Sequence, residues 1–339
     1  MNKVLVTGGG GFIGLALVRT LCSRKIQVRV LGRNHYPKAE SAGARCIRGD
    51  IRDAATVARA VQGCDTVFHV AAKAGIWGTY RQYHSINVIG TQNVIEACHN
   101  HGVQVLVYTS TPSVVFDGRD LQGVDESIPY ASAPLCHYTT TKIQAEKLVL
   151  ETNDQRLRTA AIRPHLVWGP GDTNLIPRLM QRGRERSLRI VGNGNNLVDI
   201  AYIDNVVHAH ILAAHNLHTR ATAAARPFFI GQQQAVALWP WINDLFARMQ
   251  IPVVTKKISL AQARILGRLL ETVHTLLRLQ SEPKMTRFLA EQLAMSHWFS
   301  KKNAETILGY REQVSTDQGM ERLVSWLQTT DQHHPNPEG

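Results

Sequence analysis

The sequence lacks the features of membrane-spanning, disulfide-stapled and repeat proteins. No stretch of its 339 residues approaches the roughly 18–20 uncharged apolar residues that a spanning helix needs. The five cysteines are scattered and include no CxxC pair, which argues against a disulfide framework and a zinc site. We therefore expect a cytoplasmic protein without a metal. The chain runs from Met1 directly into an apolar strand, so we also expect no cleavable leader.

Acidic residues are scarce: 26 Asp and Glu stand against 38 Lys and Arg, which gives a net charge of +12. Such an excess suits nucleic acid, an anionic membrane surface, or an anionic cofactor and substrate. The basic residues are spread along the chain and form no arginine-rich arm or known nucleic-acid motif. We therefore predict no nucleic-acid partner.

The first 165 residues alternate short apolar runs with amphipathic stretches. This alternation predicts an α/β fold with a doubly wound parallel sheet and right-handed crossovers. The expected strands are Val4–Thr7, Val28–Leu31, Arg45–Ile47, Thr66–Val70, Val105–Tyr108 and Thr159–Ile162. The expected helices are Phe12–Ser23, Ala54–Gln62, Tyr83–Asn100 and Tyr138–Glu151.

The pattern loosens after Trp168, where Gly169-Pro170-Gly171 marks a break. We predict a first domain over residues 1–168 with returns at about 201–230. A smaller C-terminal substrate-binding lobe would take residues 169–200 and 231–328, and residues 329–339 would form a disordered tail. Further strands are expected at Leu188–Val191 and Pro227–Ile230, and helices at Asn174–Gly183, Asn205–His215, Trp239–Arg248, Ser259–Leu279 and Thr316–Leu327.

Glycines cluster between the first strand and the first helix. Gly8 permits a tight turn, Gly11 lets the backbone approach a pyrophosphate, and Gly14 permits close helix packing. The free N–H groups of the helix N-terminus then face the phosphates. A glycine run alone indicates only a turn. At this junction it predicts a Rossmann dinucleotide site, in which Phe12 and Ile13 also contact the cofactor.

The end of the second strand indicates which dinucleotide binds. Sites selective for NAD place an acidic residue there, on the ribose 2′-hydroxyl. This chain has Arg33 and no acid, so we predict NADP(H), with Arg33 on the 2′-phosphate rather than free in a solvated loop. After the third strand, Asp50 and Ile51 are placed to contact the adenine. Asp50 could instead cap the following helix.

Tyr138 and Lys142 lie four residues apart at the start of an expected helix, so they share one face. A neighbouring ammonium favours the phenolate and lowers the tyrosine pKa from its ordinary value of about 10. Ser110 and Thr111 follow a strand at the edge where ligands bind in such sheets. Either hydroxyl could donate to a substrate oxygen, or bond only the backbone. Asn87 is either a site residue or a helix residue that fixes a turn.

Together these motifs resemble the extended short-chain dehydrogenase/reductases over about residues 1–330. Within them the chain is similar to the 3β-hydroxysteroid dehydrogenase branch, and in three segments to the bacterial 2-alkyl-3-oxoalkanoate reductases of long-chain olefin biosynthesis. Those three segments are AAKAGIWG from Ala71, YRQYH from Tyr80 and YTSTPSV from Tyr108. The superfamily motifs are TGGGGFIG from Thr7, HVAA from His69, NVIGT from Asn87, YTSTPSV from Tyr108, YTTTK from Tyr138 and RPHLVWGPGD from Arg163.

The resemblance implies an oxidoreductase with Tyr138 as general acid and Lys142 as its activator and ribose ligand. Thr111 would donate to the substrate oxygen, with Ser110 as the fallback, and Asn87 would belong to the catalytic set. Hydride would pass from nicotinamide C4 to the carbonyl carbon while Tyr138 protonates the oxygen. Further cofactor contacts are implied at Ala71, Pro164 and Val167.

The leading hypothesis is NADPH-dependent reduction of a 2-alkyl-3-oxoalkanoate to the 3-hydroxy acid. The alternatives are a 3β-hydroxysteroid or sterol-4-carboxylate dehydrogenase, a nucleotide-sugar epimerase, and a non-catalytic NADP sensor. An epimerase normally holds NAD, against which the missing acid counts, and a sensor need not keep the Tyr–Lys pair. A carboxylated substrate needs a nearby cation, for which His165 and Arg178 are the candidates.

The stretch Ser259–Leu279 carries an apolar face with arginines beside it. It is either an ordinary core-facing helix or a lid or membrane-surface helix over a long-chain pocket. The second alternative would make the protein membrane-peripheral. We also expect a homo-oligomer and leave open a complex with upstream pathway enzymes.

Overall fold

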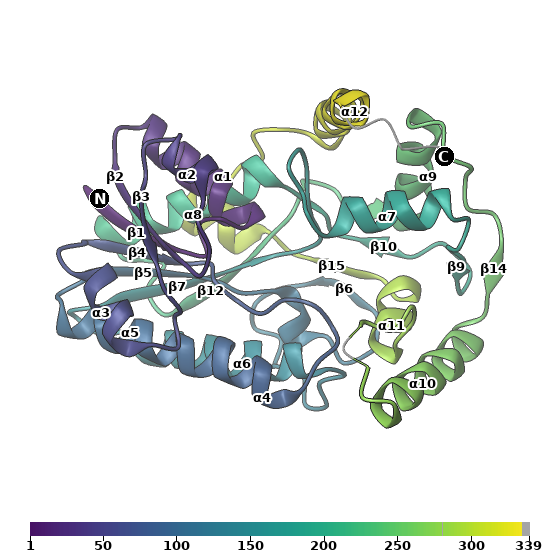
Figure 1. The fold of residues 1–339 in the computed structure, drawn as a ribbon, viewed down its shortest axis with the longest axis horizontal. Coiled ribbons are helices and arrows are strands. Elements are labelled where there is room, and N and C mark those ends of the chain that lie inside the picture. The colour runs from purple at the N-terminus through teal and green to yellow at the C-terminus, as the bar shows by residue number, and fades with distance from the viewer. Residues whose placement is uncertain (280, 334–339) are drawn as a thin grey trace.

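The computed structural model describes residues 1–279 and 281–333, with side chains described up to Thr330. Its centre is a seven-stranded sheet in which every neighbouring pair is parallel (Figure 1). The strands are β1 (Lys3–Thr7), β2 (Gln27–Gly32), β3 (Arg45–Arg48), β4 (Thr66–His69), β5 (Val105–Thr109), β7 (Arg158–Pro164) and β12 (Arg226–Ile230). They lie in the order β12-β7-β5-β4-β1-β2-β3, which confirms the predicted doubly wound sheet.

Helices cover both faces of this sheet, which is why its central strands are almost continuously apolar. All five residues of β5, for example, are buried. One face carries α1 (Phe12–Ser23) and α8 (Ile203–His218), as Figure 1 shows. The other face carries α3 (Ala54–Val61), α5 (Gly90–Asn100) and α6 (His137–Glu151). The short α2 (Pro37–Glu40) follows β2.

The strand order reverses between β1 and β4, because the chain winds outward from β1 in both directions. At such a switch point the loops after the two strands separate and leave a crevice at their carboxyl ends. Gly8, after β1, and Ala71, after β4, meet there. A Cβ atom on Gly8 would lie 2.8 Å from the Ala71 Cα atom. The fold therefore places the glycine loop at the crevice.

A smaller lobe is built on a four-stranded sheet in the order β13-β10-β15-β6, with bounds β13 (Val236–Ala237), β10 (Leu197–Val198), β15 (His297–Phe299) and β6 (Leu121–Val124). Two strand pairs join β8 (Val167–Trp168) to β11 (Ala201–Tyr202) and β9 (Ile190–Val191) to β14 (Lys257–Ile258). These strands are two to four residues long, too short for a periodic signal. β6, from within the first 168 residues, pairs with β15, so the chain passes between the lobes more often than expected.

The remaining helices are α4 (Tyr80–His84), α7 (Leu175–Arg184), α9 (Leu238–Arg248), α10 (Leu260–Leu276), α11 (Arg287–Ala294) and α12 (Thr316–His333), with short 3-10 or π segments at Pro112–Val115, Ser85–Ile89 and Ala304–Leu308. Two expectations need correction. The helix expected over Tyr83–Asn100 is divided into α4, the π-helix and α5. The tail expected to be disordered from residue 329 instead continues α12 as far as His333. Residues 334–339 lie outside the described residues.

The core-facing interpretation of the α10 stretch is also wrong. Only Ala263 and Gly267 of α10 are buried, where they pack on α11. Its apolar side chains project outward, and Figure 1 shows the helix at the edge of the molecule, away from the seven-stranded sheet. Exposed apolar side chains of this segment are Ile265, Leu266, Leu269, Val273, Leu276, Leu277 and Leu279. Among the described residues, no helix is long and apolar enough to span a membrane.

Candidate active site

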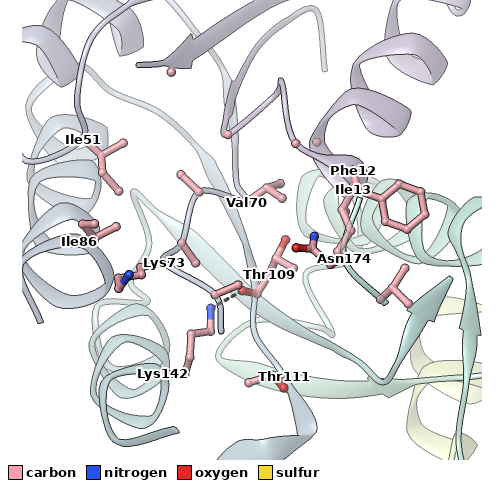
Figure 2. Close-up of a pocket in the computed structure, with 18 of the residues that line it drawn as sticks. Phe12, Ile13, Ile51, Val70, Lys73, Ile86, Thr109, Thr111, Lys142 and Asn174 are labelled. Atoms are coloured by element: carbon pink, nitrogen blue, oxygen red, sulfur yellow. Dashed lines mark hydrogen bonds between the residues drawn. The ribbon is translucent and has the colours of Figure 1, made fainter. Parts of the chain in front are cut away.

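A cavity of about 550 Å³ opens at the carboxyl edge of the large sheet (Figure 2). Fifteen of the eighteen predicted site residues line it. All of the predicted cofactor residues line it: Gly8, Gly11, Phe12, Ile13, Gly14, Arg33, Asp50, Ile51, Ala71, Lys142, Pro164 and Val167. So do three other predicted catalytic residues, Ser110, Thr111 and Tyr138. Asn87, His165 and Arg178 do not.

The glycine loop has the shape that a pyrophosphate needs. Gly8 adopts a φ of +70°, which is costly for other residues. A Cβ on Gly14 would overlap the Gly8 carbonyl oxygen, so only glycine lets α1 begin this close to the loop. A Cβ on Gly11 would meet that oxygen alone, at 3.4 Å, and would otherwise point into open space. The loop therefore leaves room for a ligand at the N-terminus of α1, where free N–H groups favour an anion.

The region after β2 is basic. Arg33 lines the cavity, and the Nε of Arg48 donates to the Arg33 carbonyl at 3.2 Å, which brings a second guanidinium to the same place. Tyr36 packs across Gly32, where any Cβ would lie 2.5 Å from the tyrosine ring. Neither Arg48 nor Tyr36 belongs to a sequence motif. Arg48 lies opposite Gly32 in the β2–β3 pairing, which brings it to Arg33.

Asp50 lines the cavity and does not cap α3. Its carboxylate accepts two hydrogen bonds from the Arg52 guanidinium, at 2.7 and 3.0 Å, and these hold the pKa of Asp50 below its ordinary value. The cap is Asp53, which accepts from the backbone N–H groups of Ala55 and Thr56. The alternative that Asp50 caps the helix is therefore wrong, and Asp50 stays an ionised acceptor at the cavity wall.

Lys142 is buried beneath the cavity with 1% of its surface exposed. Its Nζ donates to the Thr109 carbonyl at 2.6 Å (dashed in Figure 2) and lies 4.1 Å from the centroid of the Tyr108 ring. Burial lowers the pKa of Lys142 to about 7, because a low-dielectric environment disfavours the ammonium, and Glu146 opposes the shift. The lysine is thus about half protonated at neutral pH.

Tyr138 has the opposite shift from the one that the sequence predicts. Desolvation raises its pKa to about 12, and hydrogen bonding by the Thr111 hydroxyl acts the other way. Lys142 does not lower it, because the ammonium is directed to the Thr109 carbonyl and is itself weakened by burial. In this environment the phenol stays protonated at neutral pH, which is the form that can donate a proton.

Two further hydroxyls line the same cavity as the phenol. Thr111 Oγ1 accepts from the Ser113 N–H at 3.2 Å and shares a 3.0 Å hydrogen bond with the Ser113 hydroxyl. Thr111 therefore makes the local backbone hydrogen bond that was one of the two alternatives for this hydroxyl. Ser110 Oγ is buried and has no hydrogen-bond partner among the described residues, although it lines the cavity. An unpaired buried hydroxyl is costly, so this atom fits a site that a ligand oxygen completes.

Asn87 is a positioning residue rather than a cavity residue. It is buried in the π-helix, a rare form that often marks functional sites. Its Oδ1 accepts from the Lys73 N–H at 2.7 Å, and its Nδ2 donates to the Lys73 carbonyl at 3.2 Å and to Thr141 Oγ1 at 3.1 Å. Asn87 thus ties the loop after β4 to α6, which carries Tyr138 and Lys142.

The two predicted carboxylate ligands are engaged elsewhere. His165 is buried, and its Nε2 lies 2.6 Å from Nδ1 of His297. Burial and the neighbouring imidazole lower the pKa of His165 well below its ordinary value, so it carries no charge at neutral pH. Arg178 forms a two-pronged ion pair with Glu282 at 2.9 and 3.3 Å. Neither residue lines the cavity, which corrects the prediction.

A second cavity of about 990 Å³ lies between α10 and two segments next to the active site. One segment is the loop 76–80, which continues from Lys73 and Ala74 in the first cavity wall, and the other is the approach to Tyr138 at residues 135–137. From α10 its lining residues are Arg268, Glu271, Thr272, His274, Thr275 and Leu276. The two cavities therefore share the same loops.

Comparison with known proteins agrees with this geometry. The family model described as "3-beta hydroxysteroid dehydrogenase/isomerase family" matches residues 5–259. The chain is 48% identical to a 2-alkyl-3-oxoalkanoate reductase from Stenotrophomonas maltophilia, over 95% of this chain and 98% of that protein. It is 34% identical to the mouse (Mus musculus) decarboxylating sterol-4-alpha-carboxylate 3-dehydrogenase, over 95% and 90%. A solved structure, MoeE5 in complex with UDP-glucose and NAD, superposes with a TM-score of 0.74 at 25% identity, over 97% and 99%.

Proposed function

Because the chain belongs to the 3-beta hydroxysteroid dehydrogenase/isomerase family, a branch of the extended short-chain dehydrogenase/reductases, we propose that it reduces a 2-alkyl-3-oxoalkanoate to the 2-alkyl-3-hydroxyalkanoate with NADPH. The observation that carries this proposal is a protonated phenol, Tyr138, in one cavity with two hydroxyls and a glycine loop. The choice of substrate is supported by the Stenotrophomonas reductase, which this chain matches along nearly its whole length.

The residues divide the chemistry as follows. The nicotinamide cofactor supplies the hydride that the ketone carbon accepts. Ser110 and Thr111 donate hydrogen bonds to the ketone oxygen, where negative charge develops. Tyr138 then gives its phenolic proton to that oxygen. Lys142 would contact the ribose of the cofactor. An ammonium turned from the Thr109 carbonyl toward the phenol would favour the phenolate that remains, which makes donation of the Tyr138 proton easier.

The deciding assay follows NADPH absorbance with a long-chain 2-alkyl-3-oxo acid. Tyr138→Phe should lower kcat about 10²–10⁴-fold, the usual contribution of a positioned general acid. Tyr310→Phe is the matched control, since it also loses a buried phenol hydrogen bond, to the Gly231 carbonyl, but outside the cavity. If Tyr138→Phe keeps near-normal kcat, Tyr138 is not the acid.

We also propose NADP(H) rather than NAD(H). The basic surroundings of Arg33, with Arg48 against its carbonyl and no acid at the end of β2, suit a 2′-phosphate. Arg33→Ala should raise the KM for NADPH about 10–100-fold and leave the KM for NADH nearly unchanged, because only NADPH carries the phosphate. A wild-type enzyme with a lower KM for NADH would refute this choice.

A second candidate substrate class is favoured by the mouse relative. Sterol-4-carboxylate oxidation would use the same phenol and hydroxyls, and it also acts on a hydroxyl next to a carboxylate-bearing carbon. Turnover of NADP⁺ with a 3β-hydroxysterol 4-carboxylate, together with no turnover of the alkyl oxo acid, would replace the first proposal with this one.

We further propose that α10 attaches this cytoplasmic protein to an anionic membrane surface. Its outward side chains form an apolar face, and Leu276 and Leu277 are 75% and 66% exposed. Arg268 and Arg278 on the same segment, and the net charge of +12, complement anionic headgroups. Leu276→Gln with Leu277→Gln should abolish co-sedimentation with phosphatidylserine vesicles. The exposed Val253→Gln is the control. Lost self-association with unchanged vesicle binding would identify α10 as an interface between copies instead.

A further inference from the structure

Lys73 is one of the cations that line the active-site cavity. It follows β4 in the chain. Among the described residues no carboxylate lies within ion-pair distance of its Nζ, which lies over the face of the Tyr83 ring, 5.0 Å from the centroid. By contrast, Arg52 and Arg178 are neutralised by carboxylates. Figure 2 shows Lys73 on the same side of the cavity as Lys142, across from Phe12 and Asn174.

The fold fixes this cation relative to the reacting centre. Asn87 clamps the Lys73 backbone on both its N–H and its carbonyl, and the same amide group reaches Thr141, one residue before Lys142 on α6. The Tyr83 ring, on which the ammonium rests, packs edge-to-face against the Tyr138 ring at 6.4 Å between centroids. The two contacts therefore connect Lys73 to the helix that carries the phenol.

Tyr83 holds the next part of the loop. It is buried, and its hydroxyl contacts the carbonyls of Gly75 and Trp77 at 2.8 and 3.0 Å. Burial raises the pKa of Tyr83 above its ordinary value, so the ring stays neutral and its face stays attractive to a cation. Lys73 is thus held in place by a ring contact that leaves its N–H donors available to an anion.

We propose that Lys73 binds the carboxylate of the substrate. The inference rests on the proposed function, in which the carboxylate lies two bonds from the ketone carbon and so enters the cavity with it. An ammonium in a partly buried cavity attracts a carboxylate far more strongly than one in bulk water. This assignment replaces His165 and Arg178, which the structure shows to be otherwise engaged, and makes Lys73 the residue that selects the acid over its neutral analogues.

The test uses the oxidation direction, because 2-alkyl-3-hydroxy acids do not lose CO₂ as the oxo acids do. The full-length enzyme is assayed with NADP⁺ and either the 2-alkyl-3-hydroxy acid or its methyl ester. Lys73→Met should raise the KM for the acid about 10–100-fold, the usual worth of a charge-assisted hydrogen bond, and leave the KM for the ester unchanged. Lys73→Arg, which keeps the charge, should retain most of the preference for the acid.

Lys147→Met is the matched control, since Lys147 also lies over a tyrosine ring, that of Tyr130, but on the exposed side of α6. An equal loss with acid and ester would show that Lys73 only shapes the loop. If Lys73→Met raises the dissociation constant for NADP⁺, measured by titration without substrate, Lys73 belongs to the cofactor phosphates instead. Either result overturns the inference while the reductase proposal stands. A wild-type enzyme that turns over neither compound overturns both.

Discussion

Replacing Lys142 with methionine should stabilise the protein at neutral pH, although it removes a residue of the active site. Burial lowers the Lys142 pKa from 10.5 to about 7. Each pKa unit corresponds to about 1.4 kcal/mol, so at pH 7 the folded state loses about 4 kcal/mol through this side chain. Methionine has a similar length and no charge, and it removes this cost.

One interaction is lost in exchange. The Thr109 carbonyl accepts a hydrogen bond from the Lys142 Nζ at 2.6 Å. A buried acceptor left without its partner lowers the free energy of unfolding by about 1–3 kcal/mol. The net gain for Lys142→Met at pH 7 is therefore about 2 kcal/mol in the free energy of unfolding. At the same pH the variant should have a lower kcat, because the charge beside Tyr138 is gone.

The effect should reverse with pH. Between pH 7 and 10.5 the unfolded chain binds more protons at Lys142 than the folded chain, so the wild type gains stability as the pH rises through this window. By pH 10 the burial cost falls below about 1 kcal/mol, and the lost hydrogen bond then makes the variant the less stable protein by about 1 kcal/mol.

The measurement is urea unfolding of both proteins at pH 7 and pH 10, followed by far-UV circular dichroism without added cofactor. Lys147→Met, an exposed lysine on the same helix, is the control and should show little change at either pH. The reasoning is refuted if Lys142→Met is less stable than the wild type at pH 7, or if the difference between them does not change with pH.

Three other perturbations give separate readouts. Gly11→Ala should fold normally but bind NADPH at least 10-fold more weakly, since its Cβ enters the open space at the loop. Gly14→Ala should instead lower the melting temperature by several degrees, because its Cβ overlaps the Gly8 carbonyl. If the two variants behave alike in NADPH titration and in thermal melts, the glycine roles are contradicted. Ser110→Ala should destabilise the protein less than removal of a buried hydroxyl usually does, because this hydroxyl has no protein partner among the described residues. It should still reduce kcat about 10-fold. An unchanged kcat would show that Ser110 is not part of the site. Since desolvation raises the Tyr138 pKa to about 12, the phenol should stay protonated between pH 7 and 10; a fall in kcat/KM in that range that persists in Lys142→Met, which removes the lysine titration, would contradict this value.

The sequence was sufficient to predict which residues gather at the first cavity. The glycines after β1, Arg33 after β2 and Asp50 after β3 each follow a strand of a parallel sheet, and the carboxyl ends of parallel strands meet at one edge. Local pattern thus implied the spatial neighbours, because the topology of a doubly wound sheet leaves little choice.

The sequence was a poor guide to charge. From spacing alone, Lys142 should lower the pKa of Tyr138, but the structure buries Lys142, partly desolvates Tyr138 and directs the ammonium to the Thr109 carbonyl. Similarly, His165 and Arg178 looked like free cations, and their partners His297 and Glu282 lie more than a hundred residues away along the chain. A sequence does not show desolvation or a distant counterion.

By itself, then, the sequence determined the sheet, its ligand-binding edge and the family, since periodicity, glycine spacing and the Tyr–Lys motif are local properties. Only the tertiary structure decided that α10 turns its leucines outward and that Lys73 faces the cavity without a carboxylate partner. The reason is physical: whether a side chain is buried, paired or exposed depends on which distant segments pack against it, and these contacts form only when the chain has folded.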